Sequence, residues 1–146
     1  PMDLAMIFVF VGLIIALVQG GLVRRLVPRL GERALVRFGL LVNGPGFLLL
    51  AEAQSSFVLY LGLAFMAIGS AFLMPCMSAL VSRYSPPQSQ GLSMGVFRSM
   101  GSLSRAAGPL LGAFLFWKYG SSAPYWAATG ILLIPIGMSV HLPKPK

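Results

Sequence analysis

Two arginines, Arg98 and Arg105, lie within a long and otherwise apolar stretch, residues 91–117. They are seven residues apart, about two helical turns, so in a helix both side chains project from nearly one face. A charge at the centre of a bilayer costs about 2.5–3.5 kcal/mol on insertion scales, so such residues usually face a cavity or a partner. The functional interpretation is contact with a carboxylate or another anion in a water-filled pathway. The structural one is an ion pair, or a clamp on backbone carbonyls, with a helix outside this chain.

The same stretch contains a glycine- and proline-rich motif that begins at Gly101 and includes Gly108, Pro109 and Gly112. A proline inside a helix removes a backbone hydrogen bond, so we expect a break at Gly108-Pro109. Small residues four apart let helices approach closely, where packing replaces the hydrophobic drive that lipid does not supply. We interpret the motif as a packing hinge, with gating as an extension of that role. This helix is expected to be the one most enclosed by protein.

Five apolar stretches follow one another along the chain, at residues 4–21, 34–51, 57–81, 91–117 and 125–142. A helix needs about 20 apolar residues to cross the hydrocarbon core of a bilayer. The pattern therefore predicts an all-α, multi-pass transmembrane bundle of five helices, followed by a short cytoplasmic tail at residues 143–146. Between the first two stretches, Pro28 and Gly31 predict a basic hairpin.

The positive charges fall in alternate gaps between these stretches, as they do where cytoplasmic loops collect Lys and Arg. The second and fourth gaps, which would lie on the other side of the membrane, hold a single basic residue, Lys118. This pattern places the carboxyl terminus in the cytoplasm, in the plasma membrane or an intracellular membrane. The basic side holds Arg24, Arg25, Arg29, Arg33, Arg37, Arg83, Lys144 and Lys146.

Composition excludes several classes of function. Hydrophobic residues make up 57% of the 146 and charged ones 10%, and the net charge of +8 sits mainly in short loops, so topology explains it better than nucleic acid does. A single cysteine, Cys76, rules out a disulfide framework and a multi-cysteine metal site within the chain. No nucleophile–base pair or metal cluster is apparent, so we expect no enzyme, no catalytic residue, no metal and no cofactor.

No carboxylate lies within a span: Asp3 and Glu52 are at span ends, and Glu32 lies in the basic gap. If transport is coupled to protons, the carboxylate that carries them is expected in sequence outside these residues. Five crossings are an odd number, which fits a piece of a longer transporter.

These motifs resemble the carboxy-terminal half of a major facilitator superfamily transporter, in the drug:proton antiporter group that includes tetracycline exporters. Residues 101–112 resemble that group's glycine-proline signature, with Ala113 where a second glycine is common. The basic gap resembles the loop between helices eight and nine, with an apparent insertion at residues 27–29 and without the acidic residue often found there. The residues that carry this second likeness are Gly21, Arg24, Arg25, Gly31 and Arg33.

The resemblance covers the whole chain and implies that the five stretches are helices eight to twelve of a twelve-helix fold. It implies a fragment of a secondary active transporter that moves small organic solutes, such as organic anions or drugs, by alternating access and with possible proton coupling. The glycine-proline helix would pack against an amino-terminal half, with Arg105 facing the central cavity. Two alternatives stay open: a truncated membrane fragment that does not transport, and a channel or receptor-like membrane protein.

Overall fold

The computed structural model describes residues 2–140, with side chains described for residues 4–139, and this part of the chain is helical without any strand. The end of the fifth predicted stretch and the tail at 143–146 lie outside the described residues. The predicted all-α bundle of five helices is confirmed. The helices are α1 (Met2–Leu17), α2 (Arg24–Ala51), α3 (Ser56–Tyr84), α4 (Gln90–Tyr119) and α5 (Ala123–Val140), with a π-helical segment η1 (Val18–Val23) and a 3-10 turn η2 (Pro87–Ser89).

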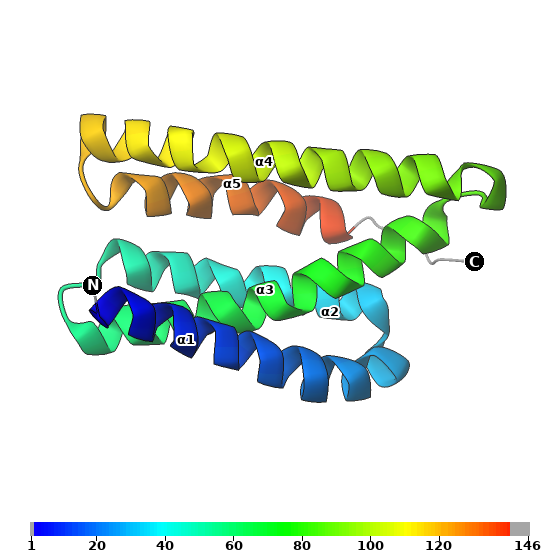
Figure 1. Ribbon diagram of the computed structural model, residues 1–146, viewed down its shortest axis with the longest axis horizontal. Coiled ribbons are helices and arrows are strands. Elements are labelled where there is room, and N and C mark those ends of the chain that lie inside the picture. The colour runs from blue at the N-terminus through cyan, green and yellow to red at the C-terminus, as the bar shows by residue number, and fades with distance from the viewer. Residues whose placement is uncertain (1, 141–146) are drawn as a thin grey trace.

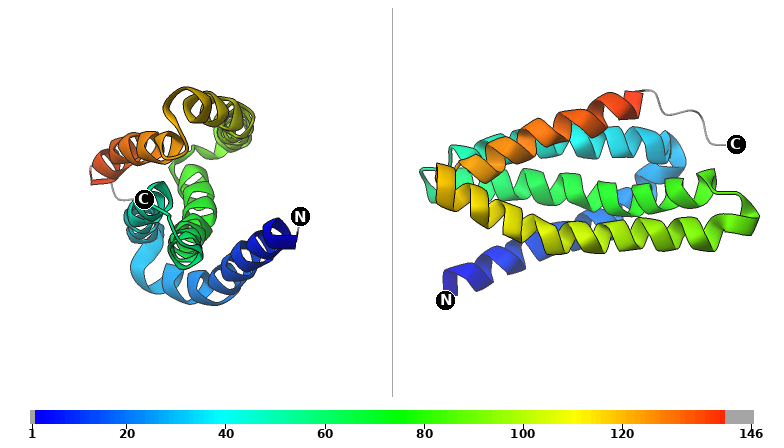
Figure 2. Two further views of the ribbon diagram at one scale, coloured as in Figure 1. Left: turned by 90° about the vertical axis from the view of Figure 1, so that its left-hand side faces the viewer. Right: turned by 90° about the horizontal axis from the view of Figure 1, so that it is seen from above.

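The helices form two layers, with α4 and α5 side by side on one side of α1, α2 and α3 (Figure 1). Seen along the bundle, α3 lies centrally and contacts α1, α2 and α4 (Figure 2). The bend between α1 and α2, the connection from α3 to α4 and the carboxyl end of α5 all lie at one end of the bundle. We call this the arginine-rich end, since most of the arginines lie near the bend and the connection from α3 to α4.

The first two helices form one helical run with η1, which spans 48 residues from Leu4 to Ala51. A straight helix of that length would measure about 72 Å, far more than the roughly 30 Å of a hydrocarbon core. The run bends at Gly31, whose φ of 77° and ψ of 157° are readily adopted only by glycine. The predicted hairpin is therefore correct as a reversal of direction but wrong as a loop, because helix continues on both sides of Gly31, and Pro28 lies inside it.

By length and composition alone, that run and α3 are apolar enough to cross a membrane. The described part of α5, Ala123–Ser139, is a shorter apolar helix. Helix α4 does not meet the same criterion, because arginine, serine, glycine and proline lower its hydropathy. It is the least lipid-like of the long helices.

The tightest contact in the fold is the crossing of α2 and α3, where glycines bring the two backbones together. A Cβ added at Gly69 would lie 2.5 Å from Asn43 Nδ2 and 2.7 Å from the carbonyl oxygen of Gly39. A Cβ at Gly46 would lie 2.9 Å from the backbone nitrogen of Met66. A Cβ does not normally approach other atoms this closely, so the crossing requires glycine at these positions.

A polar side chain sits inside this crossing. Asn43 is 3% exposed, and its Nδ2 donates to the carbonyl of Gly39 at 3.0 Å. Its Oδ1 is buried and accepts no hydrogen bond from the described residues. Burying an unpaired acceptor costs about 1–3 kcal/mol, a cost that the surrounding packing has to offset.

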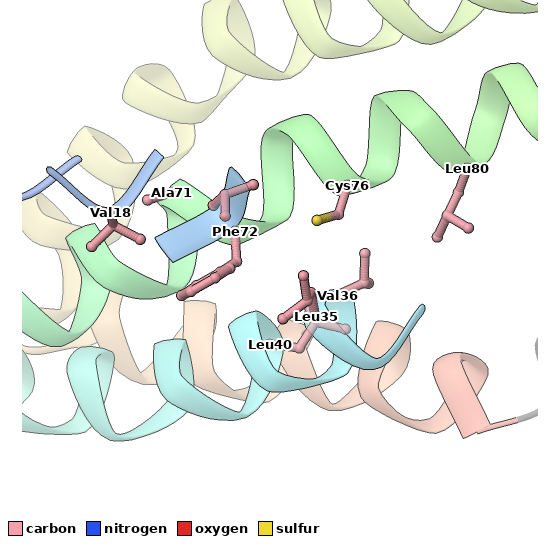
Figure 3. Close-up of a cluster of buried hydrophobic side chains, with 9 residues drawn as sticks. Val18, Leu35, Val36, Leu40, Ala71, Phe72, Cys76 and Leu80 are labelled. Carbon is pink, nitrogen blue, oxygen red and sulfur yellow. The ribbon is translucent and has the colours of Figure 1, made fainter. Parts of the chain in front are cut away.

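An apolar cluster extends the crossing toward the arginine-rich end (Figure 3). Phe72 and Cys76 of α3 are each 1% exposed, and Leu35 of α2 is equally buried. The rings of Phe38 and Phe72 meet edge to face with centroids 5.4 Å apart. Cys76 is thus a small buried side chain in the core, and η1 adds Val18 to the same cluster.

Hydrogen bonds fasten α5 and the turn before it to α2, near both ends of α5. At the arginine-rich end, Arg37 donates from Nε and Nη2 to the carbonyl of Ser139, at 2.9 and 2.7 Å. At the opposite end, the Ser122 hydroxyl donates to the carbonyl of Ala51 at 2.7 Å, next to the carboxyl end of α2. Helices α2, α3 and α5 therefore form one connected unit.

Gly69→Ala is expected to destabilise the bundle by roughly 1–3 kcal/mol, because the new methyl group meets backbone atoms that cannot move aside cheaply. Gly130→Ala is the matched control, since a Cβ there meets nothing within 4 Å and alanine has the better helix propensity. The measurement is the temperature at which Cys76, the single cysteine, reacts with a fluorogenic maleimide in detergent. Equal midpoints for the Gly69 variant and the parent chain would contradict the packing argument.

Candidate functional site

The two arginines predicted as a substrate contact both lie on α4 with exposed side chains. Side chains on a helix point toward its amino terminus, so Arg105 reaches back over the preceding turn. Its Nη2 lies 3.1 Å from the Ser102 hydroxyl, and Nη1 lies 3.5 Å from the position that a Cβ on Gly101 would occupy. The structure thus brings Arg105 together with Gly101 and Ser102 and leaves Arg98 apart from them.

Neither arginine has a carboxylate partner among the described residues. Only two acidic side chains are described: Glu32 bonds Arg83, and Glu52 follows the carboxyl end of α2. A guanidinium carries five N–H donors, and Arg105 uses one of its nitrogens for Ser102. The remaining donors can bind a carboxylate or phosphate in the bidentate geometry that suits these groups.

The glycine-proline motif does not interrupt α4, so the predicted break is wrong. The helix runs from Gln90 to Tyr119 with Pro109 inside it. What remains is one missing hydrogen bond, because proline has no N–H to donate to the carbonyl of Arg105, four residues earlier. Added Cβ atoms at Gly108 and Gly112 would meet nothing within 4 Å, so no described residue packs against this side of the motif.

The prediction that this helix is the most enclosed is also wrong within the described residues. None of the described residues of α4 is buried, and the helix contacts only η2, α3 and α5 (Figures 1 and 2). The small residues that favour close helix packing therefore line a surface with no neighbour in this chain. The prediction took small residues as a sign of enclosure, but enclosure also needs a partner helix.

The residues of the predicted cytoplasmic loop motif are spread along helix on both sides of the Gly31 bend. Gly21 lies in η1, and Arg24 and Arg25 begin α2 with exposed side chains. Arg33, beyond the bend, is partly buried and has interactions within the protein.

Sequence reasoning missed an ion pair that joins two connections at the arginine-rich end. Arg83 Nη1, near the carboxyl end of α3, lies 2.8 Å from Glu32 Oε2, next to the bend. An open depression of about 460 Å³ lies beside this pair, lined in part by Gly31, Arg37 and Arg83. The sequence held a sign of this pair. Glu32 is the one acidic residue in the gap between the first two apolar stretches, and Arg83 lies in the gap between the third and fourth, which the charge pattern places on the same side of the membrane.

Comparison with known proteins gives consistent matches. The profile of the Major Facilitator Superfamily matches residues 2–146. Over 138 residues the chain is 39% identical to human (Homo sapiens) major facilitator superfamily domain-containing protein 10, covering 94% of this chain and 30% of that protein. It is 30% identical to the class D tetracycline resistance protein of Salmonella ordonez, covering 89% of this chain and 34% of that protein.

A solved structure matches as well. The crystal structure of the human organic anion transporter MFSD10 (TETRAN) superposes with a TM-score of 0.87 at 38% identity. The match covers 94% of this chain and 32% of that one. The chain therefore spans about a third of the length of the relatives it matches.

The Glu32–Arg83 pair is expected to contribute at most about 1 kcal/mol, because the Arg83 side chain is 54% exposed and solvent screens it. A double-mutant cycle with Glu32→Gln, Arg83→Gln and their combination measures this coupling by thermal unfolding in detergent. The coupling should weaken further in 0.5 M NaCl. A coupling above about 2 kcal/mol that salt does not change would contradict this assignment.

Proposed function

The chain belongs to the Major Facilitator Superfamily, and from this premise we propose that it is the carboxy-terminal part of a secondary active transporter for small organic anions. The family is one of integral membrane transporters, which favours this function over a channel, a receptor or an enzyme. The solved relative is described as an organic anion transporter, and that supports the class of cargo. The chain covers about a third of that relative, so the proposed activity belongs to a longer protein.

The observation that carries the proposal is that Arg105 is exposed and has no acidic partner among the described residues. The Arg105 guanidinium is positioned by Ser102 over Gly101. The structural alternative, an ion pair with a helix outside this chain, is separated from anion binding by the Arg105 variants described below. An arginine with unused donors on an uncovered helix suits a carboxylate-bearing solute.

We place the proposed pathway along α4. Substrates of this fold bind near the midplane between the two halves. Helices α1 and α4 have no buried residue among those described, and of these two only α4 carries arginine. Its open glycines at 108 and 112 would let a helix of an amino-terminal half approach closely during alternating access. Arg98, on the same helix two turns away, would then be a second anion contact nearer the arginine-rich end.

The direction of the chain across the membrane follows from charge. The arginine-rich end is proposed to be cytoplasmic, because cytoplasmic loops collect Lys and Arg. Proton coupling, if the transporter uses it, is assigned to a carboxylate outside these residues, since Glu32 is ion-paired and Glu52 lies at a helix end.

A second cargo class, tetracycline-like drugs, is favoured by the tetracycline resistance relatives. The two arginines on α4 favour an anionic cargo instead, because they would repel a cationic one. Transport of an anionic solute in preference to a matched cationic one distinguishes the two.

In the longer transporter, Arg105→Gln should lower transport of an anionic solute at least about tenfold, because charged hydrogen bonds contribute about 1.5–3 kcal/mol. Arg105→Lys should recover only part of the rate, since lysine keeps the charge but not the planar fork. Lys118→Gln, which removes a charge at the far end of α4, is the matched control. Uptake is measured alongside surface labelling of folded protein. A loss of folded protein equal to the loss of uptake would assign Arg105 a structural role instead.

The 146 residues alone are expected not to transport, because they supply only one wall of the proposed pathway. The measurement is uptake of a labelled organic anion into proteoliposomes that contain the purified chain, compared with empty liposomes. Uptake well above the empty control would contradict this prediction, because it would show that these residues form a complete pathway.

A further inference from the structure

Three arginines at the start of α2 are not used by the proposed transport pathway. Arg24, Arg25 and Arg29 have exposed side chains and make no hydrogen bond or ion pair with any described residue. We call them the basic cluster. The other arginines at this end are engaged: Arg37 bonds the Ser139 carbonyl, Arg83 bonds Glu32, and Arg33 has interactions within the protein.

No acidic side chain in the described structure is available to the basic cluster. Glu32 is 2.8 Å from Arg83, and Glu52 lies at the other end of α2. The sequence has one further acid, Asp3, near the start of α1. Three adjacent cations that the described residues leave unneutralised indicate an anionic partner from outside them.

The segment that carries the cluster is amphipathic. At about 100° per residue, the three arginines fall within about 140° of arc. On the opposite arc, Leu26 and Val27 pack against the buried apolar cluster. The same segment also exposes apolar side chains: Leu22, which lies next to Arg29 around the helix, is 50% exposed, and Leu30, on the apolar arc, is 58% exposed. Exposed leucines next to arginines suit a boundary between hydrocarbon and headgroups rather than open water.

We propose that the basic cluster is a binding surface for anionic phospholipid headgroups. The guanidinium groups of Arg24, Arg25 and Arg29 would bind headgroup phosphate and carboxylate, while Leu22 and Leu30 contact the adjoining acyl chains. Each arginine close to a membrane surface raises the binding constant for anionic lipid by about fivefold. The surface lies beside the Gly31 bend, so bound lipid would hold the amino-terminal arm of α2 against the membrane. This inference does not rest on the proposed transport function.

The test compares lipids bound to the purified full chain in detergent. Native mass spectrometry, titrated with phosphatidylserine or phosphatidylcholine of the same acyl chains, gives the relative affinity for the first bound lipid. The chain should prefer phosphatidylserine at least about tenfold. The triple variant Arg24→Gln, Arg25→Gln, Arg29→Gln should reduce this preference to within about twofold of phosphatidylcholine.

The charge-matched control is the triple variant Lys118→Gln, Lys144→Gln, Lys146→Gln, which removes three cations that belong neither to the basic cluster nor to the proposed pathway. It should keep the preference of the parent chain. An equal loss in the control would mean that net charge, rather than the basic cluster, selects the lipid, and would overturn the proposal. So would an undiminished preference in the basic-cluster variant.

Three further measurements complete the test. The reactivity of Cys76 on heating checks that each variant is folded, and if the basic-cluster variant is not, the salt dependence of the parent chain takes its place. Phosphatidylserine preference should fall severalfold in 0.5 M NaCl, and a preference unchanged by salt would overturn the proposal. Competition by millimolar inorganic phosphate as strong as that by phosphatidylserine would assign the cluster to free anions and also overturn it.

Discussion

The close approach of α2 and α3 is the constraint on which the rest of the described structure depends. Gly39, Gly46 and Gly69 leave no space for a side chain, so the two backbones pack directly against each other. In a bilayer, where lipid is as apolar as leucine, such van der Waals contact is the main force that joins helices. The crossing also buries Phe72 and Cys76, and it fixes the position from which α2 can reach α5.

From this crossing the chain divides into a fastened part and an open part. Helix α5 is joined to α2 near both of its ends, through Arg37 and through Ser122, whereas α4 buries none of its described residues. Helix α1 also buries none of its described residues, but it carries no arginine, so α4 is the charged helix of the open part. The charged residues follow this division: Arg37 and Arg83 bond within the packed unit, while Arg98 and Arg105 stay on the open helix.

The sequence predicted the fold well, because apolar stretches of membrane length and alternating charge report directly on helices that cross a bilayer. The resemblance to the superfamily is confirmed too, including a particular likeness to the vertebrate tetracycline-transporter-like protein, major facilitator superfamily domain-containing protein 10. The details that failed depend on pairing across the fold. Glu32 and Arg83 are 51 residues apart, the chain reversal at Gly31 is helical, and enclosure of α4 needs a partner. Arg105 was singled out because an arginine in an apolar stretch is visible locally, and its role in binding stays a prediction.

The bond between Ser122 and Ala51 has a consequence for how α4 can move. It anchors the turn after α4, while at the other end Gln90 donates to the carbonyl of Ser82 in α3 at 3.4 Å. A tilt of α4 about the anchored turn therefore requires the Gln90 bond to break first. Displacement in a lever grows with distance from its fulcrum. Arg105 is about 21 Å and Arg98 about 32 Å along the axis from Tyr119, at 1.5 Å per residue. A small rotation of α4 would therefore displace Arg98 about one and a half times as far as Arg105, so the two arginines of one helix would move by different distances.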